Sequence, residues 1–321
     1  MTGTRAAVLT FTPNPSIDVG ASTERITPEH KLRCTDLHRD PGGGGVNVAR
    51  VLQRLGTDCL ALFPAGGAMG RLLQHRLDEE AVPAIVLEIG GETRESFTVL
   101  ERTSGREFRF VLPGPRLTEP EWQAGLDRVE SLLDAFPWVV ASGSLPEGVP
   151  NDYYARLAAV VHRRGGRIAV DASGPALAAA LEAGVDLVKP NLRELRELTG
   201  EALEHEVDWA RAAEELVRSG GAGIVALSLG AHGALIAAAG ETIRAHALEV
   251  PIAGTVGAGD SFLAAVVWCL NGGRSLDDAL RHGVAAGTAA LLSPGTRLAL
   301  RDDVLRLAAD VRTKRLQGNV R

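Results

Sequence analysis

The sequence predicts an α/β fold in which a mostly parallel sheet is covered by helices on both faces. Short apolar runs that end in Gly, Ser, Asn or Asp alternate with amphipathic helical stretches along most of the 321 residues. This alternation is typical of parallel strands connected by helices. Two more polar segments interrupt it and predict a small second sheet. No long linker divides the chain, so we expect one domain over residues 1–321.

Six apolar runs are the expected strands of the main sheet. They are "AAVLTFT" from Ala6, "CLALFPAG" from Cys59, "WVVASGS" from Trp138, "RIAVDAS" from Arg167, "DLVKPN" from Asp186 and "GIVALSLG" from Gly223. The expected helices between them cover residues 46–55, 118–134, 152–164 and 192–198. Ligands of open α/β sheets bind at the carboxyl ends of the strands. Polar clusters follow these strands, so the functional site is expected at that edge.

The two interrupting segments are residues 16–40 and 92–111. The first is mixed and polar, whereas the second, "ETRESFTVLERTSGREFRFV", alternates polar and apolar residues around a turn near Ser104. That alternation predicts an antiparallel hairpin with one wet and one dry face. We expect the two segments to form a projecting sheet that covers the active site, a second subunit, or both.

Composition excludes several classes of protein. The formal net charge is −6 and the pI is near 5.8, which gives no basic surface for nucleic acid or acidic membranes. No apolar run reaches the roughly 18 residues of a membrane span, and no signal core follows a charged start. The three cysteines and eight histidines show no disulfide or metal-ligand spacing. We expect a cytoplasmic protein with no nucleic-acid or membrane partner.

The stretch "TVGAGDSF" places an acid directly before an apolar run. Asp260 follows Gly257, Ala258 and Gly259, three slim residues whose backbone N–H groups can approach an anion closely. One interpretation is a tight turn and a capped buried helix. The other is an anion-binding helix N-terminus beside a carboxylate that takes a hydroxyl proton.

Four consecutive glycines in "DPGGGGVNVAR" precede a helix with Asn47 in its first turn. Four glycines cost much backbone entropy in a bare linker, so close approach of the backbone to a ligand is the better interpretation. The run fits neither a GxGxxG fingerprint nor a GxxxxGK[ST] loop. A nucleotide, if bound, is therefore held by other means.

Other strand ends carry further polar candidates. In "VKPNLREL", Asn191 and Glu194 have the spacing of a helix capping box, and Glu194 is also placed to hold magnesium through water; both roles are compatible. Hydroxyl and N–H groups recur in "ASGSLPEG" and "SLGAHGA". Arg94 and Arg109 on the expected hairpin form either a solvated face or a bidentate grip on phosphate.

Taken together, these motifs resemble the ribokinase-like carbohydrate kinases of the PfkB family over nearly the whole chain. The resemblance rests on the order and spacing of "TPNPSID", "PGGGGVNVAR", "PAGG", "SGSLPEG", "KPNLRE" and "TVGAGDSF". Within the family, the chain is most similar to the subgroup of minor bacterial 6-phosphofructokinases, through "KLRC", "FPAGG", "FRFVLPG" and "SPGTR".

The resemblance implies a three-layer α/β/α core with a small β lid that also forms a homodimer clasp. It implies ATP and Mg²⁺, and a monovalent cation such as K⁺ near "SPGTR". Asp260 would be the base, with an anion hole of Gly257, Ala258 and Gly259. The other implied contacts are Asp18, Gly43 and Asn47 for the sugar, Lys31, Arg94, Arg109 and Ser144 for its phosphate, Asn191 and Glu194 for magnesium and phosphates, and Lys189, Ser228 and Gly230 for the nucleotide.

One departure from the family pattern bears on the substrate. Related 1-phosphofructokinases and tagatose-6-phosphate kinases carry a lysine in the glycine run, where Gly44 stands here. Its absence favours a 6-phosphate held by lid cations. The expected reaction transfers the γ-phosphoryl group of MgATP to the C1 hydroxyl of fructose 6-phosphate, giving fructose 1,6-bisphosphate. The alternatives are a 1-phosphofructokinase, a tagatose-6-phosphate kinase, a nucleoside kinase, or a non-catalytic sugar-phosphate sensor, against which the intact "GAGD" argues.

Overall fold

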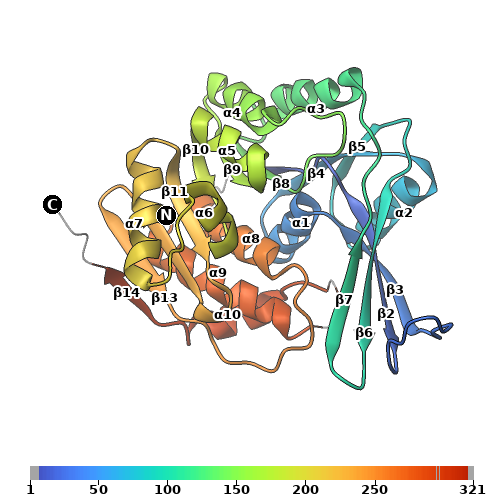
Figure 1. Ribbon diagram of the computed structural model, residues 1–321. Coiled ribbons are helices and arrows are strands. Elements are labelled where there is room, and N and C mark those ends of the chain that lie inside the picture. The colour runs from blue at the N-terminus through green and yellow to red at the C-terminus, as the bar shows by residue number, and fades with distance from the viewer. Residues whose placement is uncertain (1–6, 294, 296, 317–321) are drawn as a thin grey trace.

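A ten-stranded sheet forms the centre of the molecule (Figure 1). The structure is a computed structural model that describes residues 7–293, 295 and 297–316. The strands of this sheet are β1 (Val8–Phe11), β4 (Cys59–Ala65), β5 (Ala84–Glu88), β8 (Trp138–Ser142), β9 (Arg167–Asp171), β10 (Val185–Val188), β11 (Ala222–Ser228), β12 (Ala234–Ala238), β13 (Glu241–Ala245) and β14 (Thr313–Leu316).

The order of the strands is β14-β13-β12-β11-β10-β9-β8-β1-β4-β5. From β5 to β11 all neighbours are parallel, whereas β12, β13 and β14 continue the sheet as an antiparallel end. The expectation of a mostly parallel sheet is confirmed. Because the six expected strands are all parallel neighbours, their carboxyl ends meet at one edge.

Helices cover both faces of the sheet, which gives the three-layer core. One face carries α1 (Gly44–Arg54), α2 (Gly67–Glu79), α8 (Ala258–Asn271), α9 (Leu276–Leu291) and α10 (Arg301–Ala308). The other carries α3 (Glu119–Leu132), α4 (Tyr153–Arg163), α5 (Gly174–Ala183), α6 (Leu192–Thr199) and α7 (Glu206–Arg218). Successive strand side chains point to opposite faces, so Val8 packs in one apolar cluster and Leu9 in the other.

A second sheet of four strands projects from the core (Figure 1). Its strands are β2 (Ser16–Thr23), β3 (Thr35–Gly42), β6 (Arg94–Glu101) and β7 (Arg106–Val111), in the order β3-β2-β6-β7. Residues 16–40 and 92–111 thus supply this sheet, although β3 runs on to Gly42. The β6–β7 pair is antiparallel, and Gly105 turns between them with φ of 70°. We call this sheet the lid.

Several elements differ from the sequence expectation. Helix α1 begins at Gly44, inside the glycine run, because the N–H of Asn47 already bonds to the Gly43 carbonyl at 2.9 Å. Strands β12 to β14 were not expected, since their short runs lie among turn residues. Among the described residues, none of the helices combines the length and apolar character needed to cross a membrane.

Candidate active site

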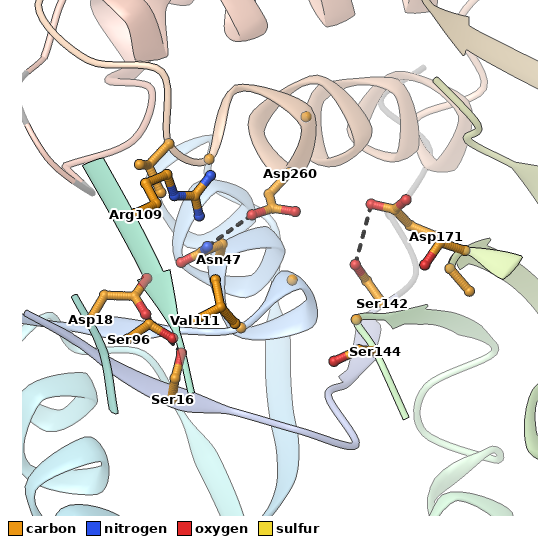
Figure 2. A pocket seen from close by; sticks show the side chains of 18 of the residues that line it. Ser16, Asp18, Asn47, Ser96, Arg109, Val111, Ser142, Ser144, Asp171 and Asp260 are labelled. Atoms are coloured by element: carbon orange, nitrogen blue, oxygen red, sulfur yellow. Dashed lines mark hydrogen bonds between the residues drawn. The ribbon is translucent and has the colours of Figure 1, made fainter. Parts of the chain in front are cut away.

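A cavity of about 430 Å³ lies between the carboxyl ends of the parallel strands and the lid (Figure 2). Strand ends β8, β9 and β10 contribute Ser142, Asp171 and Lys189. The lid contributes residues of β2, β6 and β7, and the first turns of α1 and α8 complete the wall. The site therefore lies at the edge of the sheet where polar clusters predicted it.

Asp260 lies in the first turn of α8 and points into this cavity (Figure 2). Gly257 is the N-cap residue with φ of 75°, a left-handed conformation that favours glycine. Because the first N–H groups of a helix lack intrahelical partners, residues 257–259 present donors beside the carboxylate. Asn47 Nδ2, from α1, donates to Asp260 Oδ2 at 2.8 Å.

The environment of Asp260 makes its carboxyl a much weaker acid than an exposed one. Burial, with repulsion from Asp171, raises its pKa to about 6. The hydrogen bond from Asn47 and the charge of Lys189 act in the opposite direction, whereas Asp18 adds a smaller repulsion. A carboxyl group with such a pKa is ionised at neutral pH and strong enough as a base to take a proton.

Lys189 is the buried cation of the site. Its side chain pairs with Asp171 Oδ1 at 3.1 Å and is 5% exposed. Burial alone would favour the neutral amine, but Asp171, Glu194 and Asp260 outweigh it and raise the pKa of Lys189. A Cβ atom at Gly259 would lie 3.6 Å from Lys189 Nζ, so a fixed positive charge stands beside the helix N-terminus.

Glu194 and Asn191 form the capping box of α6, as one interpretation of the sequence predicted. The N–H of Glu194 donates to Asn191 Oδ1 at 2.9 Å, and the N–H of Asn191 donates to Glu194 Oε2 at 2.8 Å. Glu194 also lines the cavity, and burial raises the pKa of its carboxyl. Helix capping and a place at the cavity thus coexist in one side chain.

The glycine run packs against the protein itself. A Cβ atom at Gly42 would lie 2.3 Å from Asp18 Oδ1, and one at Gly44 would lie 2.1 Å from Ser142 Oγ. Gly43 has φ of 108°, and a Cβ atom there would meet Thr12 at 2.8 Å. Gly43 and Gly44 nevertheless line the cavity, so close approach of a ligand to the run stays a prediction. Its glycines let α1 begin against the strand ends, which brings Asn47 to Asp260.

The lid places one acid and two arginines at the cavity. Asp18 accepts from Ser16 Oγ at 2.7 Å; burial raises the pKa of Asp18, while Ser16, Arg109 and Arg94 oppose the rise. Arg94 donates to the carbonyls of Leu112 and Asn14, at 3.2 and 3.1 Å. Its Nε is buried and has no hydrogen-bond partner among the residues that the structure describes. Arg109 extends from β7 toward the same space (Figure 2).

Two other candidates for the sugar phosphate have different positions. Ser144 lines the cavity and accepts from Asn14 Nδ2 at 3.1 Å. Lys31 is exposed in the connection between β2 and β3, and it is not among the residues that line the cavity. The single chain therefore does not bring Lys31 to the other lid cations, because the β2–β3 connection lies away from the strand ends.

One candidate for the nucleotide, Gly230, borders a second cavity of about 970 Å³, whereas Lys189 lines the first. The apolar side chains of Phe262 and Leu248 also line the second cavity. Ser228 ends β11 and forms an isolated parallel bridge with Asn191. Thr255 lines both cavities, so they meet at the start of α8. Two ligands bound in them would face each other across residues 257–260.

Comparison with known proteins identifies the family. The model of the pfkB family carbohydrate kinases matches residues 14–303. The chain belongs to the PfkB family. It is 44% identical over 299 residues, 93% of this chain and 88% of the relative, to the ATP-dependent 6-phosphofructokinase isozyme 2 of Mycobacterium tuberculosis strain H37Rv. It is 42% identical over 303 residues, 94% of this chain and 98% of the relative, to the isozyme 2 of Escherichia coli K12.

Solved structures of this family share the same arrangement. The crystal structure of phosphofructokinase-2 from E. coli in complex with substrates and products has a TM-score of 0.92 and 42% identity, and the match covers 95% of this chain and 99% of that one. The same enzyme in complex with fructose-6-phosphate gives a TM-score of 0.90 with 40% identity, covering 95% and 99%. The expected PfkB resemblance and the ribokinase-like fold are both confirmed.

The site of this PfkB chain also contains residues that were not predicted from the sequence. Asp171 pairs with Lys189 and accepts from Ser142 Oγ at 3.3 Å. It ends the expected strand "RIAVDAS", so the strand-end rule could have found it. Ser16, which donates to Asp18, lies in the motif "TPNPSID", but no role was predicted for its hydroxyl. In the loop at residues 293–297, expected near a monovalent cation, Pro294 and Thr296 lie outside the described residues.

Proposed function

We propose that this protein is an ATP-dependent 6-phosphofructokinase that phosphorylates the C1 hydroxyl of fructose 6-phosphate, giving fructose 1,6-bisphosphate. The observation that carries the proposal is the buried carboxylate of Asp260, held by Asn47 where two cavities meet at a helix N-terminus. The curated relatives at 42–44% identity are named as ATP-dependent 6-phosphofructokinases, which supports the choice of acceptor. A reaction between ATP and a sugar phosphate also suits a cytoplasmic location.

Asp260 acts as the general base. Its carboxylate accepts the proton of the C1 hydroxyl as the oxygen attacks the γ-phosphorus, and the bond from that phosphorus to the ADP oxygen breaks. The N–H groups of Gly257, Ala258 and Gly259, together with Lys189, stabilise the negative charge of the transferring group. The hydrogen bond from Asn47 keeps the carboxylate aimed at the cavity.

The sugar phosphate occupies the lid side of the first cavity. Asp18 accepts from sugar hydroxyls, and Gly43 and Asn47 border the ring. Arg94, Arg109 and Ser144 bind the phosphate, and the unpartnered Arg94 Nε supplies a donor for it. The positive charge matters because two anions must meet, and their repulsion in a cleft of low dielectric is worth several kcal/mol.

The nucleotide occupies the second cavity, with Gly230 and Ser228 at its edge and Lys189 and Asn191 toward its phosphates. Glu194 is the residue that would hold Mg²⁺, through water. The residue fits this role because Glu194 is a carboxylate that lines the cavity, and Mg²⁺ usually binds one or two carboxylates plus phosphates. When bound, Mg²⁺ would neutralise phosphate charge.

A K⁺ ion near residues 293–297 is part of the proposal, and the E. coli enzyme has been solved in complex with potassium.

We further propose that the whole chain is one kinase domain whose lid forms a homodimer. Leu37 and Phe110 on the lid strands are 60% and 55% exposed, apolar side chains that a second copy would bury. The partner lid would bring its Lys31 to a sugar phosphate that Lys31 cannot reach in its own chain. The E. coli enzyme has been solved in a tetrameric inhibited form, so family members do associate.

A coupled assay of ADP release tests the proposed reaction. The acceptors are fructose 6-phosphate, fructose 1-phosphate and tagatose 6-phosphate, each with MgATP. We expect the highest kcat/KM with fructose 6-phosphate. Preference for fructose 1-phosphate or tagatose 6-phosphate would assign one of the alternative sugar-phosphate kinases. Release of no ADP with any of the three acceptors would contradict the proposal and favour the nucleoside kinase or the non-catalytic sensor.

A further inference from the structure

A chain of hydrogen bonds leads from Asp260 to helix α2 behind the cavity. Asn47 Nδ2 donates to Asp260 Oδ2 at 2.8 Å, and Asn47 Oδ1 accepts from Arg50 Nη1 at 3.3 Å. Arg50 also donates to the Pro41 carbonyl at 3.0 Å and is 2% exposed. It does not line the cavity; its hydrogen bond to Asn47 links it to Asp260, and its charge also acts on Asp18.

Glu80 holds the guanidinium of Arg50 in place. Arg50 Nε donates to Glu80 Oε1 and Oε2 at 3.1 and 3.0 Å, and Nη2 donates to Oε1 at 2.6 Å. Arg54 Nη2 donates to Glu80 Oε2 at 3.0 Å, which fixes the carboxylate from the other side. A forked contact of this kind sets the orientation of both planar groups.

The two ends of an amide differ, because the oxygen only accepts and the nitrogen only donates. Arginine can only donate, so Arg50 requires Asn47 to present its oxygen, and the NH₂ group then faces Asp260. The reversed amide would set an oxygen against a carboxylate. We propose that Arg50, held by Glu80, is a positioning residue that fixes the Asn47 amide so that it donates to Asp260. This inference rests on the proposed function, in which Asp260 is the base.

The proposal has a consequence for the ionisation of Asp260. The Asn47 hydrogen bond lowers the pKa of that carboxyl, against burial and Asp171, so a freed amide would let the pKa rise from about 6. A hydrogen bond to a charged group suggests a rise of about one unit. The other charged groups that face Asp260 or line its cavity remain in every variant below; they are Asp18, Asp171, Lys189, Glu194, Arg94 and Arg109.

The first test is the pH dependence of kcat for Arg50→Met, divided by that of the wild type at each pH from 5.5 to 9. The ratio cancels the titration of the substrate phosphates. We expect the ratio to be about fivefold lower at pH 6 than at pH 8.5, because a rise of about one unit from a pKa of about 6 lowers the ionised fraction at pH 6 from about one half to about one eleventh. A ratio that is equally low at every pH would show a merely structural role and overturn the proposal.

A double-mutant cycle with Asn47→Ala shows whether Arg50 acts through Asn47. In that background, Arg50→Met is expected to add no pH-dependent loss. If Arg50→Met causes as large a pH-dependent loss of kcat in the Asn47→Ala background as in the wild type, the charge of Arg50 acts on Asp260 directly, and the positioning role is refuted. Glu80→Gln is combined with Asn47→Ala in the same way. By itself it should lower the pH-dependent ratio in the same direction as Arg50→Met but by less, and it tests the positioning role if Arg50→Met does not fold. Glu79→Gln, an exposed neighbour paired with Arg76, is the matched control and keeps the wild-type profile.

A readout without turnover separates this inference from the proposed reaction. ¹³C NMR of labelled Asp carboxyls, with Asp260→Asn to assign the signal, gives the titration midpoint of Asp260. We expect it about one unit higher in Arg50→Met. If the wild type phosphorylates fructose 6-phosphate but the Asp260 midpoint is the same in Arg50→Met, the positioning role of Arg50 is rejected while the proposed function stands. A wild type that phosphorylates no sugar phosphate rejects the proposed function, while the midpoint still decides the role of Arg50.

Discussion

The Asp260 carboxylate is ionised at neutral pH and is held in one orientation by Asn47. Replacing Asp260 therefore tests its role as the base. Asp260→Asn keeps the shape of the side chain but cannot accept the proton. We expect kcat to fall by about 10² to 10⁴ with little change in either KM, because general-base catalysis contributes that much. Steady-state kinetics by ADP release checks this. Near-normal turnover would remove Asp260 from the base role.

The raised pKa of Asp260 predicts how activity responds to acid. The base works as the carboxylate, and its pKa of about 6 lies well above that of an ordinary aspartate. As the pH falls through about 6 the carboxylate is lost, so kcat at saturating substrates should fall to about half of its plateau at pH 6 and to about a tenth at pH 5. A profile of kcat from pH 8 to 5 tests this. A rate that stays level down to pH 5 would contradict it.

Single residues show where sequence reasoning succeeds and fails. Asp260 and Glu194 could be found because each stands at a helix start after a recognisable turn. Arg50 could not, because it reads as an ordinary helical cation, and its burial depends on Glu80, 30 residues away. Lys31 was placed with the lid arginines by resemblance alone, and the single chain does not bring it there.

At the scale of elements, the lid arginines should affect one substrate more than the other. Arg94→Ala removes a buried donor beside Asp18 on the sugar side. We expect a rise in KM for the sugar phosphate of about tenfold to a hundredfold, in line with the loss of a hydrogen bond to a charged group, and little change for ATP. Arg116→Ala, which removes an exposed ion pair with Glu147, is the control. Equal weakening of both substrates would contradict the lid assignment.

Helix α1 depends on the glycine run for its position. A Cβ atom at Gly44 would lie 2.1 Å from Ser142 Oγ, so Gly44→Ala must displace the Ser142 hydroxyl, and the Ser142 Cβ and carbonyl carbon at 3.1 and 3.2 Å then crowd the start of α1. Overpacking of this kind costs about 1–3 kcal/mol, and the shift should also lower kcat by moving Asn47. Thermal unfolding and kinetics measure both. Gly90→Ala is the control: its Cβ atom would meet only an ordinary contact at 3.8 Å, so it should change neither the unfolding temperature nor kcat. If Gly44→Ala also leaves both unchanged, the glycine run tolerates side chains and the account of α1 is wrong.

Helices and strands could be predicted from the sequence where their hydrophobic pattern extends over many residues. Six of the seven strands in the parallel part of the sheet, and helices α1, α3, α4 and α6, follow from alternating runs, whereas β5 was not expected. The antiparallel end from β12 to β14 does not, because short strands such as "ALIAA" carry no signal that sets their direction. The sequence also does not reveal that Asp18 and Ser142 crowd Gly42 and Gly44, since both lie far from them along the chain.

For the whole molecule, we expect the exposed lid to bury its apolar face in a dimer. Phe110→Asp should shift the protein toward monomer, because a charge would be buried without a partner. Sedimentation velocity measures this. Val207→Asp, on α7 and 72% exposed, is the matched control and should leave the oligomer intact. A wild type that is monomeric at all concentrations would refute the lid dimer.

The central claim is that the two cavities bring ATP and a sugar phosphate together at Asp260. The most direct test is ³¹P NMR of the products formed by the wild type from MgATP and fructose 6-phosphate. The account predicts ADP and fructose 1,6-bisphosphate in equal amounts, with the new phosphate on C1. Release of inorganic phosphate without bisphosphate, or no change in ATP, would contradict it.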